Sequence, residues 1–205
     1  MPDRLPNFAI HPGYTHKVDV VAWDDRKFKH EAQRVVYHTS YTLSQRHGLT
    51  SVFDIGCGSG WKLVNLKGFR RRIGSEIEPC FSFLKETYPE GEWIFSDLSK
   101  PSPVQDVDLV MASDVIEHLV NPDLLMDYID GIAKWKYLVL STPDRDSVHG
   151  RNHQGPPRNP CHVREWSPDE FYRYVIQRFP VISIAMAGSQ IVVCDRSRAK
   201  CTLAM

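Results

Sequence analysis

The stretch SVFDIGCGSG, residues 51–60, decides the fold class of this 205-residue chain. Its first five residues are mostly apolar, and glycines follow at alternate positions. That order is typical of a buried strand that turns directly into a helix, because glycine tolerates positive φ and lets a ligand approach the backbone. The stretch therefore predicts a strand–loop–helix unit with a binding loop at the carboxyl end of the strand.

Short apolar runs alternate with helical stretches along the rest of the chain. Further strands are expected at residues 72–77, 92–96, 107–112 and 137–141, and helices at about 60–67, 79–88, 121–133 and 168–177. Two last strands, at residues 181–186 and 190–194, flank Ala187-Gly188-Ser189 and should pair as an antiparallel hairpin. Because strands that alternate with helices form parallel sheets, the sequence predicts a Rossmann-like α/β fold. We expect a seven-stranded, mostly parallel sheet with an antiparallel last strand and helices on both faces.

The part of the chain before the first predicted strand is expected to cover the site. A helix is predicted over residues 23–47, with Asp24 and Asp25 near its start, where the helix dipole favours carboxylates. We expect residues 1–48 to form a lid, and residues 49–205 to form a single globular domain.

Charge and cysteine usage exclude several classes of protein. Lys and Arg number 25 and Asp and Glu number 25, so the formal charge is zero, whereas proteins that bind phosphates carry a basic surplus. Nucleic acid is therefore not the expected partner, and no apolar run reaches the ~20 residues of a membrane span. Five scattered cysteines predict reduced thiols in a cytoplasmic protein: Cys57, Cys80, Cys161, Cys194 and Cys201.

Acidic residues mark three successive predicted strands. Asp54 precedes the glycines, Glu76 ends the second strand, and Asp97 follows the third. A pyrophosphate-binding loop would not carry so much negative charge, and the lysine of a P-loop is absent. A ligand with a ribose, an adenine and a cationic centre suits these residues better, because the Glu76 carboxylate can accept hydrogen bonds from both ribose hydroxyls. S-adenosylmethionine (SAM) is such a ligand.

Five blocks in order, VFDIGCGSG, IGSEIEP, FSDL, DLVMASDVIEHL and YLVLSTP, resemble the cofactor half of class I SAM-dependent methyltransferases. The resemblance covers roughly residues 50–185. It implies a set of SAM-binding residues: Asp54, Gly56 and Gly58 at the methionine portion with Cys57 between them, Glu76 at the ribose, Asp97 and the Leu98 backbone at the adenine, and Ser113 near the methionine portion.

A second group of chemically active residues follows the fourth predicted strand. On one helical turn, Asp114, Glu117 and His118 would face the same side, and His162 could join them from a later loop. Two carboxylates and two imidazoles would favour Mg²⁺, Mn²⁺ or Zn²⁺. Two other interpretations stay open: Glu117 and His118 could anchor the loop, or His118 or His162 could act as a metal-free general base on a hydroxyl.

The same block is similar to that of small-RNA 2′-O-methyltransferases, in which an E-x-x-E-H block and a later H-x-x-E-W hold magnesium on a ribose diol. In this chain Asp114 stands at the first glutamate position, and residues 162–166 read HVREW. The resemblance implies a Mg²⁺ or Mn²⁺ site, with the catalytic candidates Asp114, His118 and His162 among its ligands and Glu117 as the fourth.

Residues 142–166 are rich in Pro, Gly, Arg, Asn and His and contain no expected helix or strand. So long a loop at the carboxyl edge of a sheet is usually functional. We expect His149 and His153 to be solvated there, and Arg145 to contact either a substrate anion or solvent. Trp166 is expected to pack against apolar neighbours or, alternatively, to stack on a sugar.

The acceptor class follows from this loop. It resembles the loops of methyltransferases from polysaccharide and natural-product sugar pathways, and a vicinal diol would explain a metal. The resemblance implies O-methylation of a sugar or glycan that is free, nucleotide-linked or lipid-linked. Three alternatives stay open: 2′-O-methylation of RNA ribose, metal-free N- or O-methylation of a small metabolite, and SAM binding without activity.

Overall fold

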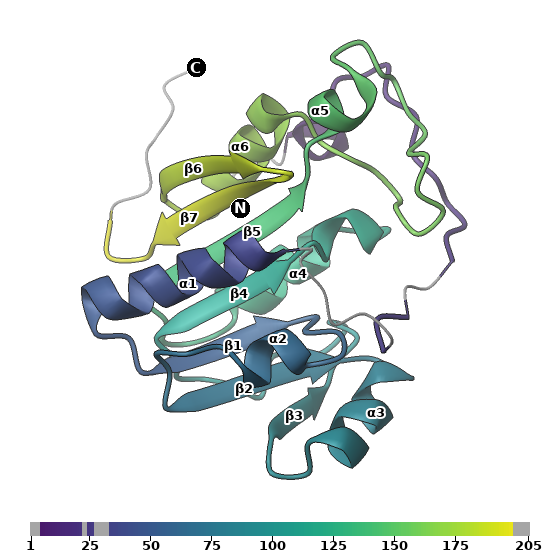
Figure 1. The fold of residues 1–205 in the computed structure, drawn as a ribbon. Coiled ribbons are helices and arrows are strands. Elements are labelled where there is room, and N and C mark those ends of the chain that lie inside the picture. Colours follow the sequence, from purple (N-terminus) through teal and green to yellow (C-terminus); the bar gives the residue numbers. More distant parts are fainter. Residues whose placement is uncertain (1–4, 22–23, 27–32, 199–205) are drawn as a thin grey trace.

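The computed structural model describes residues 5–21, 24–26 and 33–198. Its centre is one seven-stranded sheet in the order β3-β2-β1-β4-β5-β7-β6 (Figure 1). The strands are β1 (Ser51–Ile55), β2 (Arg71–Glu76), β3 (Glu92–Phe95), β4 (Leu109–Ser113), β5 (Tyr137–Pro143), β6 (Val181–Ala187) and β7 (Ser189–Asp195). The helices are η1 (Pro6–Ala9), α1 (Arg34–His47), α2 (Trp61–Val64), α3 (Cys80–Thr87), η2 (Ile116–His118), α4 (Asp123–Asp130), α5 (Arg145–His149) and α6 (Pro168–Ile176).

The predicted fold class is confirmed. Adjacent strands from β3 to β5 are parallel, whereas β7 is antiparallel to both β5 and β6. The predicted hairpin joins β6 and β7 through Gly188, whose φ of 78° suits the tight turn. The strand order reverses between β1 and β4, and open α/β sheets bind ligands beyond the carboxyl ends of the strands at such a point.

Alternate residues of the central strands are buried in two cores, one on each face of the sheet. In β1, Val52 belongs to one core and Phe53 to the other, as the two-residue period of a strand requires. Side chains from α1, α2 and α3 complete the core around Val52, and side chains from α4 and α6 complete the core around Phe53. Figure 1 shows α1 crossing β4 and β5 on one face, with α4 on the other.

The helix expected over residues 23–47 is shorter in the structure. It begins at Arg34, residues 24–26 are not helical, and residues 22–23 and 27–32 lie outside the described residues. Gln33 has a left-handed φ of 68°, so the helical path does not extend back through it. The expectation that Asp24 stands at a helix start was therefore wrong, and Asp24 accepts hydrogen bonds from the Arg26 side chain instead.

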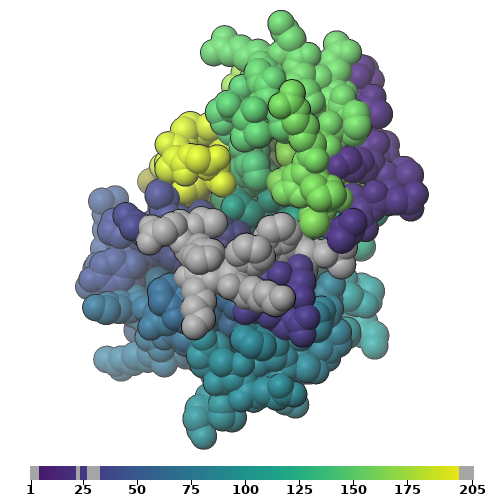
Figure 2. Space-filling model, turned by 45° about the vertical axis from the view of Figure 1, so that its right-hand side comes forward, coloured from purple at the N-terminus to yellow at the C-terminus, as the bar shows by residue number. Residues whose placement is uncertain are grey.

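The loop expected over residues 142–166 is more ordered and more buried than a surface loop. It begins with the last residues of β5 and the short helix α5, whose N-cap Asp144 accepts a hydrogen bond from the Asp146 N–H. Residues 161–166 are all buried. The N-terminal segment runs alongside (Figure 2, purple against green), and its backbone N–H groups donate to loop carbonyls: Thr15 to Gln154, Lys17 to Val163 and Val21 to Pro160.

The four described cysteines, Cys57, Cys80, Cys161 and Cys194, are unpaired and buried, while Cys201 lies outside the described residues. Within the described ranges, no helix combines the length and the apolar character that crossing a membrane requires.

Candidate functional site

The glycine loop lies where the strand order reverses, between β1 and α2. Gly56, Gly58 and Gly60 all have positive φ, at 72°, 61° and 72°. A Cβ on Gly56 would collide with the Val115 side chain, and a Cβ on Gly58 would collide with the Asp25 carboxylate. The loop is therefore packed between the segment that follows β4 and the N-terminal region, and it leaves no room for larger side chains.

Glu76, the last residue of β2, is hydrogen-bonded to this loop. Its Oε1 accepts the Gly58 N–H at 2.8 Å, and its Oε2 accepts the Ile77 N–H at 3.0 Å. Burial raises the pKa of Glu76, while these two N–H groups oppose the rise. A carboxylate offers about four lone-pair positions, so both oxygens can still accept from a ligand.

Asp54 lies inside the protein at the end of β1 and does not face solvent. Its Oδ2 accepts the Tyr37 hydroxyl of α1 at 2.6 Å, while Oδ1 has no hydrogen-bond partner among the described residues. Burial raises the pKa of Asp54 to about 7, although the Tyr37 hydroxyl and Lys62 oppose the rise. The neighbouring Cys57 thiol is also buried, and burial raises its pKa.

The other predicted cofactor residues surround the same edge of the sheet. Asp97 is exposed and accepts from the Ser99 hydroxyl at 2.5 Å, which lowers its pKa. Leu98 has a left-handed φ of 66° and is half-buried. Ser113 ends β4, is buried, and accepts the Gln33 side-chain amide on its carbonyl at 2.9 Å.

The structure brings together three of the four predicted metal ligands. Glu117 and His118 come from η2, and His162 comes from the loop after α5. One ligand atom of each of the three residues lies within 4.8 Å of the other two. The rings of His118 and His162 meet edge to face, with 4.9 Å between centroids.

Glu117 is a buried carboxylate with one oxygen that lacks a hydrogen-bond partner among the described residues. It is fully buried, and its Oε2 accepts the Thr142 hydroxyl at 3.0 Å. Its Oε1 is buried without a hydrogen-bond partner among the described residues, and burial raises the pKa of Glu117 well above its usual value. A buried carboxylate stays ionised only beside a compensating positive group. Because two imidazoles stand beside it, the donor set fits a divalent cation.

Asp114, the fourth predicted ligand, lies outside this group. Its φ is +54°, so the backbone is left-handed there and the helical turn that would align Asp114 with Glu117 does not form. Its carboxylate instead accepts the Ser141 hydroxyl at 2.6 Å and the Ser189 hydroxyl at 3.3 Å. The side chain thereby ties the end of β4 to β5 and β7.

Hydrogen bonds orient both imidazoles. His118 Nδ1 lies 2.8 Å from the Cys161 carbonyl oxygen, so this nitrogen donates and Nε2 keeps its lone pair. Burial lowers the pKa of His118 to about 4, so the ring is neutral near pH 7. His162 Nδ1 lies 2.7 Å from Glu165 Oε1.

Glu165 is the functional candidate that the sequence analysis did not single out. Its side chain is 2% exposed, and its Oε2 lies 2.9 Å from His149 Nε2. Burial would raise the pKa of Glu165, but His162 and His149 together lower it below its usual value, so the carboxylate is ionised. The spacing H-x-x-E was visible in HVREW, but the contact with His149 depends on α5.

Two expectations for the loop need correction, and a third is confirmed. His149 is not solvated, because its side chain is 4% exposed beside Glu165. Arg145 is buried and paired with Glu170 at 2.8 Å, so it faces neither a substrate nor solvent. Trp166 is fully buried against aromatic neighbours and donates to the Phe8 carbonyl, which confirms packing and excludes a sugar platform.

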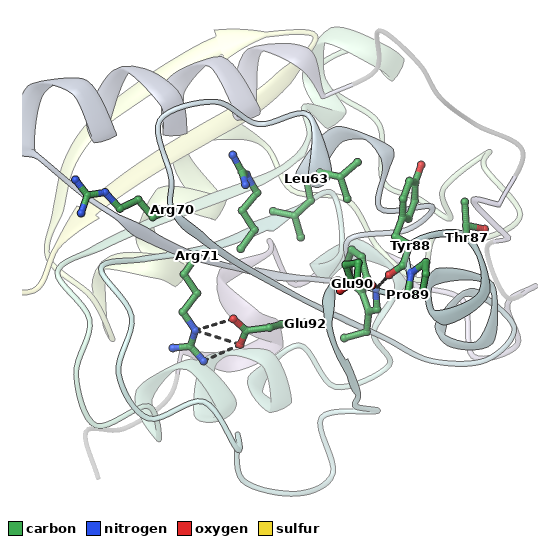
Figure 3. Close-up of a pocket in the computed structure, with 12 residues that line it drawn as sticks. Leu63, Arg70, Arg71, Thr87, Tyr88, Pro89, Glu90 and Glu92 are labelled. Atoms are coloured by element: carbon green, nitrogen blue, oxygen red, sulfur yellow. Dashed lines mark hydrogen bonds and ion pairs between the residues drawn. The ribbon is translucent and has the colours of Figure 1, made fainter.

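A cavity of about 730 Å³ lies at the opposite edge of the sheet (Figure 3). It is lined by Arg70, Arg71 and Arg72 at the start of β2 and by Glu92 at the start of β3, among others. In Figure 3, Arg71 turns toward Glu92, which its guanidinium contacts at 2.8 Å. Because ligands of open α/β sheets bind at the carboxyl ends of the strands, this cavity is not the candidate site.

Comparison with known proteins identifies the fold. No family model matches the chain, and no curated protein matches its sequence. Solved structures do match, and the chain has the fold of class I SAM-dependent methyltransferases. The resemblance found in the sequence is thereby confirmed for the fold.

In particular, three solved structures are similar to this chain. The first is the methyltransferase domain of bacterial CtHen1, with TM-score 0.64, 18% identity, and coverage of 80% of this chain and 98% of that one. The second is the small RNA methyltransferase HEN1, with TM-score 0.64, 20% identity, and coverage of 89% and 27%. The third is magnesium protoporphyrin IX methyltransferase from Synechocystis with bound SAH, with TM-score 0.62, 17% identity, and coverage of 88% and 90%.

Proposed function

We propose that this chain is a SAM-dependent methyltransferase that methylates a hydroxyl of a sugar ring carrying a neighbouring hydroxyl. The observation that carries the proposal is the cluster of buried Glu117, half-buried His118 and buried His162 at the sheet edge that also holds the glycine loop. The candidate site at this edge of the sheet thus has two halves. The first half suits a nucleoside, and the second half suits the two neighbouring hydroxyl oxygens of an acceptor.

The first half fits SAM by its open acceptors. Glu76 retains lone pairs beside the positive-φ glycines, and Asp54 Oδ1 has no partner in the described part of the chain. When bound, SAM supplies a methyl group on a sulfonium, and the acceptor oxygen displaces the sulfur as the hydroxyl loses its proton. Glu76 would hold the ribose hydroxyls, and the Asp54 side of the loop would face the methionine portion.

The second half fits a divalent cation held by Glu117, His118 and His162. A bound Mg²⁺ or Mn²⁺ would supply Lewis acidity to two adjacent hydroxyls. The Thr142 hydroxyl positions Glu117, the Cys161 carbonyl positions His118, and the Glu165 carboxylate positions His162. The acceptor oxygen would therefore meet a preformed set of ligands. Alignment of the reacting atoms accounts for much of the acceleration in such displacements. Asp114 would act indirectly, by fixing the end of β4.

A metal-free version uses the same residues. Neutral His118 has a lone pair on Nε2, and a pKa of about 4 makes this ring a weak base. The general base proposed for a hydroxyl proton in this version is therefore His162. The chelator test described below separates the two versions.

The acceptor proposed first is a sugar or glycan, nucleotide-linked or lipid-linked forms included. Zero net charge supports this choice over a polyanion. The terminal ribose of an RNA is the second candidate, because it has the same vicinal diol and because the structure is similar to that of the small RNA methyltransferase HEN1.

The test is transfer of labelled methyl from SAM to a panel of acceptors, with Mg²⁺, with Mn²⁺ and with EDTA. The panel contains nucleotide sugars, glycan oligomers, RNA with a 3′-terminal diol, and the same RNA with a 2′-deoxy terminal nucleotide. We expect transfer to a diol acceptor and loss of transfer in EDTA. Full activity in EDTA would overturn the metal, and no heat on titrating SAM into the protein would overturn the methyltransferase itself.

A further inference from the structure

The carboxylate of Glu165 is buried next to His162. Among the described residues, no lysine or arginine side chain forms an ion pair with it. Glu165 is 2% exposed, and imidazoles approach both of its oxygens. His162 Nδ1 is hydrogen-bonded to Oε1, whereas His149 Nε2 lies 2.9 Å from Oε2 as an ion-pair contact without the alignment of a hydrogen bond. The Arg145 guanidinium bonds the Glu170 carboxylate and the backbone carbonyl of Glu165 rather than the Glu165 carboxylate. A buried carboxylate is costly to hold in this way, so its placement against two histidines needs an explanation.

A continuous series of contacts determines which nitrogen of His162 carries its proton. The Cys161 N–H donates to Asn159 Oδ1 at 3.0 Å, so the NH₂ of the Asn159 amide must point the other way. That NH₂ lies 2.8 Å from His162 Nε2 and can only donate, so Nε2 must accept. His162 Nδ1 therefore carries the proton and donates it to Glu165 Oε1 at 2.7 Å.

We propose that Glu165 is a positioning residue that locks His162 in the tautomer with the proton on Nδ1, and that His149 holds the Glu165 carboxylate in place. The lone pair on Nε2 accepts the Asn159 amide N–H in this structure, so a cation or a hydroxyl proton beside Glu117 and His118 would take the place of that N–H. This inference rests on the proposed function, because it specifies how His162 meets the acceptor, but it holds for both versions of the chemistry. A metal ligand and a general base alike need an unprotonated ring nitrogen.

The elements around Glu165 leave its carboxylate little freedom. Its backbone N–H donates to the Tyr14 hydroxyl of the N-terminal segment at 3.0 Å, and the next residue, Trp166, is fully buried. His149 stands at the last position of α5 and stacks on His153, with 4.5 Å between ring centroids. Carboxylates that hold metal-bound histidines from behind typically contribute 10–100-fold to metal affinity or activity, which sets the expected size of the effect.

The first experiment reads the tautomer directly in the wild-type protein. Two-dimensional ¹⁵N–¹H spectra that correlate imidazole nitrogens with ring protons distinguish a protonated nitrogen from an unprotonated one. The His162 signals are assigned by their loss in His162→Gln, at about pH 8.5, where free imidazole is neutral. We expect a protonated Nδ1 and an unprotonated Nε2 on His162. A proton on Nε2 would overturn the proposal, and this reading does not depend on activity.

The second experiment uses Glu165→Gln, which keeps the side-chain shape but replaces one acceptor oxygen by a donor. We expect a mixture of His162 tautomers, Mn²⁺ affinity and kcat reduced by about 10–100-fold, and an unchanged dissociation constant for SAM. His149→Gln should move the same quantities in the same direction by a smaller factor. Glu170→Gln is the matched control, because Glu170 is a buried carboxylate of the same region that contacts Arg145 and not His162.

The outcomes separate this inference from the proposed function. A Glu165→Gln protein with wild-type tautomer, Mn²⁺ affinity and kcat overturns the positioning role, even if the wild type is an active methyltransferase. If Glu165→Gln does not fold, the His162 tautomer and the Mn²⁺ affinity of His149→Gln decide. If the wild type binds no SAM, the proposed function fails, while the change of tautomer between the wild type and Glu165→Gln still tests whether Glu165 positions His162.

Discussion

The two halves of the candidate site are built in different ways. The cofactor half comes from one short stretch, in which a strand, three glycines and an acid at the end of the next strand meet through parallel pairing. The acceptor half joins η2, the segment around Asn159–Glu165 and the N-terminal segment, which lie far apart in the sequence. Substitutions that disrupt the cofactor half should therefore lie within one stretch of sequence. The acceptor half can be disrupted by substitutions in any of the segments that form it.

The largest expected effect is on the assembled half. His162→Ala removes either a metal ligand or the general base, so methyl transfer should fall at least about 100-fold while the dissociation constant for SAM stays the same. Radiolabel transfer and calorimetry measure the two quantities. His47→Ala is the control, because His47 contacts Tyr137 at the far edge of the sheet. Normal turnover by His162→Ala would mean that the loop over residues 142–166, here called the histidine loop, has another purpose.

The next effect concerns the local half. Glu76→Ala removes a charged acceptor of ribose hydroxyls, and such hydrogen bonds contribute about 1.5–3 kcal/mol each. SAM affinity should therefore fall at least tenfold, by about 1.4 kcal/mol or more, whereas Mn²⁺ binding should not change. Glu92→Ala changes a glutamate of β3 at the other edge and serves as the control. If calorimetry gave the same SAM affinity for Glu76→Ala and the wild type, the assignment of the ribose site would be refuted.

A smaller effect is expected for stability at the edge opposite the site. Burial alone would raise the pKa of Asp108, but the Lys136 ammonium and donors from Thr50 and Ser51 lower it below its usual value. The unfolded carboxyl takes up its proton first, so this stabilisation is complete above about pH 4 and disappears as the pH falls through the folded pKa. Asp108→Asn should cost about 1–2 kcal/mol of unfolding free energy at pH 7 and less at pH 3.

Urea unfolding at the two pH values measures this difference. SAM affinity and methyl transfer should remain those of the wild type, because Asp108 lies at the start of β4 and the site lies at its end. An equal cost at both pH values would contradict the ionic origin of the stabilisation.

The smallest effect belongs to the exposed pair beside the cavity in Figure 3. Arg71 and Glu92 contact each other at 2.8 Å with side chains 49% and 50% exposed. Exposed pairs are screened by solvent, so Arg71→Ala should cost less than about 1 kcal/mol, and the cost should shrink further in high salt. Thermal unfolding at two salt concentrations measures it. A large loss of methyl transfer in Arg71→Ala would show that the cavity contributes to function.

The fold could be predicted because its determinants are local and periodic. The alternation of Val52 and Phe53 between two cores and the turn at Gly188 both follow from short-range rules. The start of α1 was misplaced because Gln33 takes a left-handed conformation that its residue type does not announce.

The candidate site was predicted less completely, for reasons that also lie in the backbone. Spacing alone placed Asp114 with Glu117, but φ at Asp114 is +54° and sends the carboxylate to two serines. Residue type alone suggested that His149 and Arg145 lie at the surface. In the structure both are buried beside carboxylates, His149 beside Glu165 and Arg145 beside Glu170. Which polar groups meet inside a long loop depends on tertiary contacts that composition does not encode.

The N-terminal segment determines the shape of the histidine loop from a distance. The Lys17 ammonium donates a hydrogen bond to the backbone carbonyl of Asn159, 142 positions away. The Tyr14 hydroxyl accepts a hydrogen bond from the Glu165 N–H. A graft of residues 142–166 alone onto another enzyme of this fold would carry the histidines without the partners that space them. Engineers who wish to move acceptor specificity between such proteins would have to transplant both segments together.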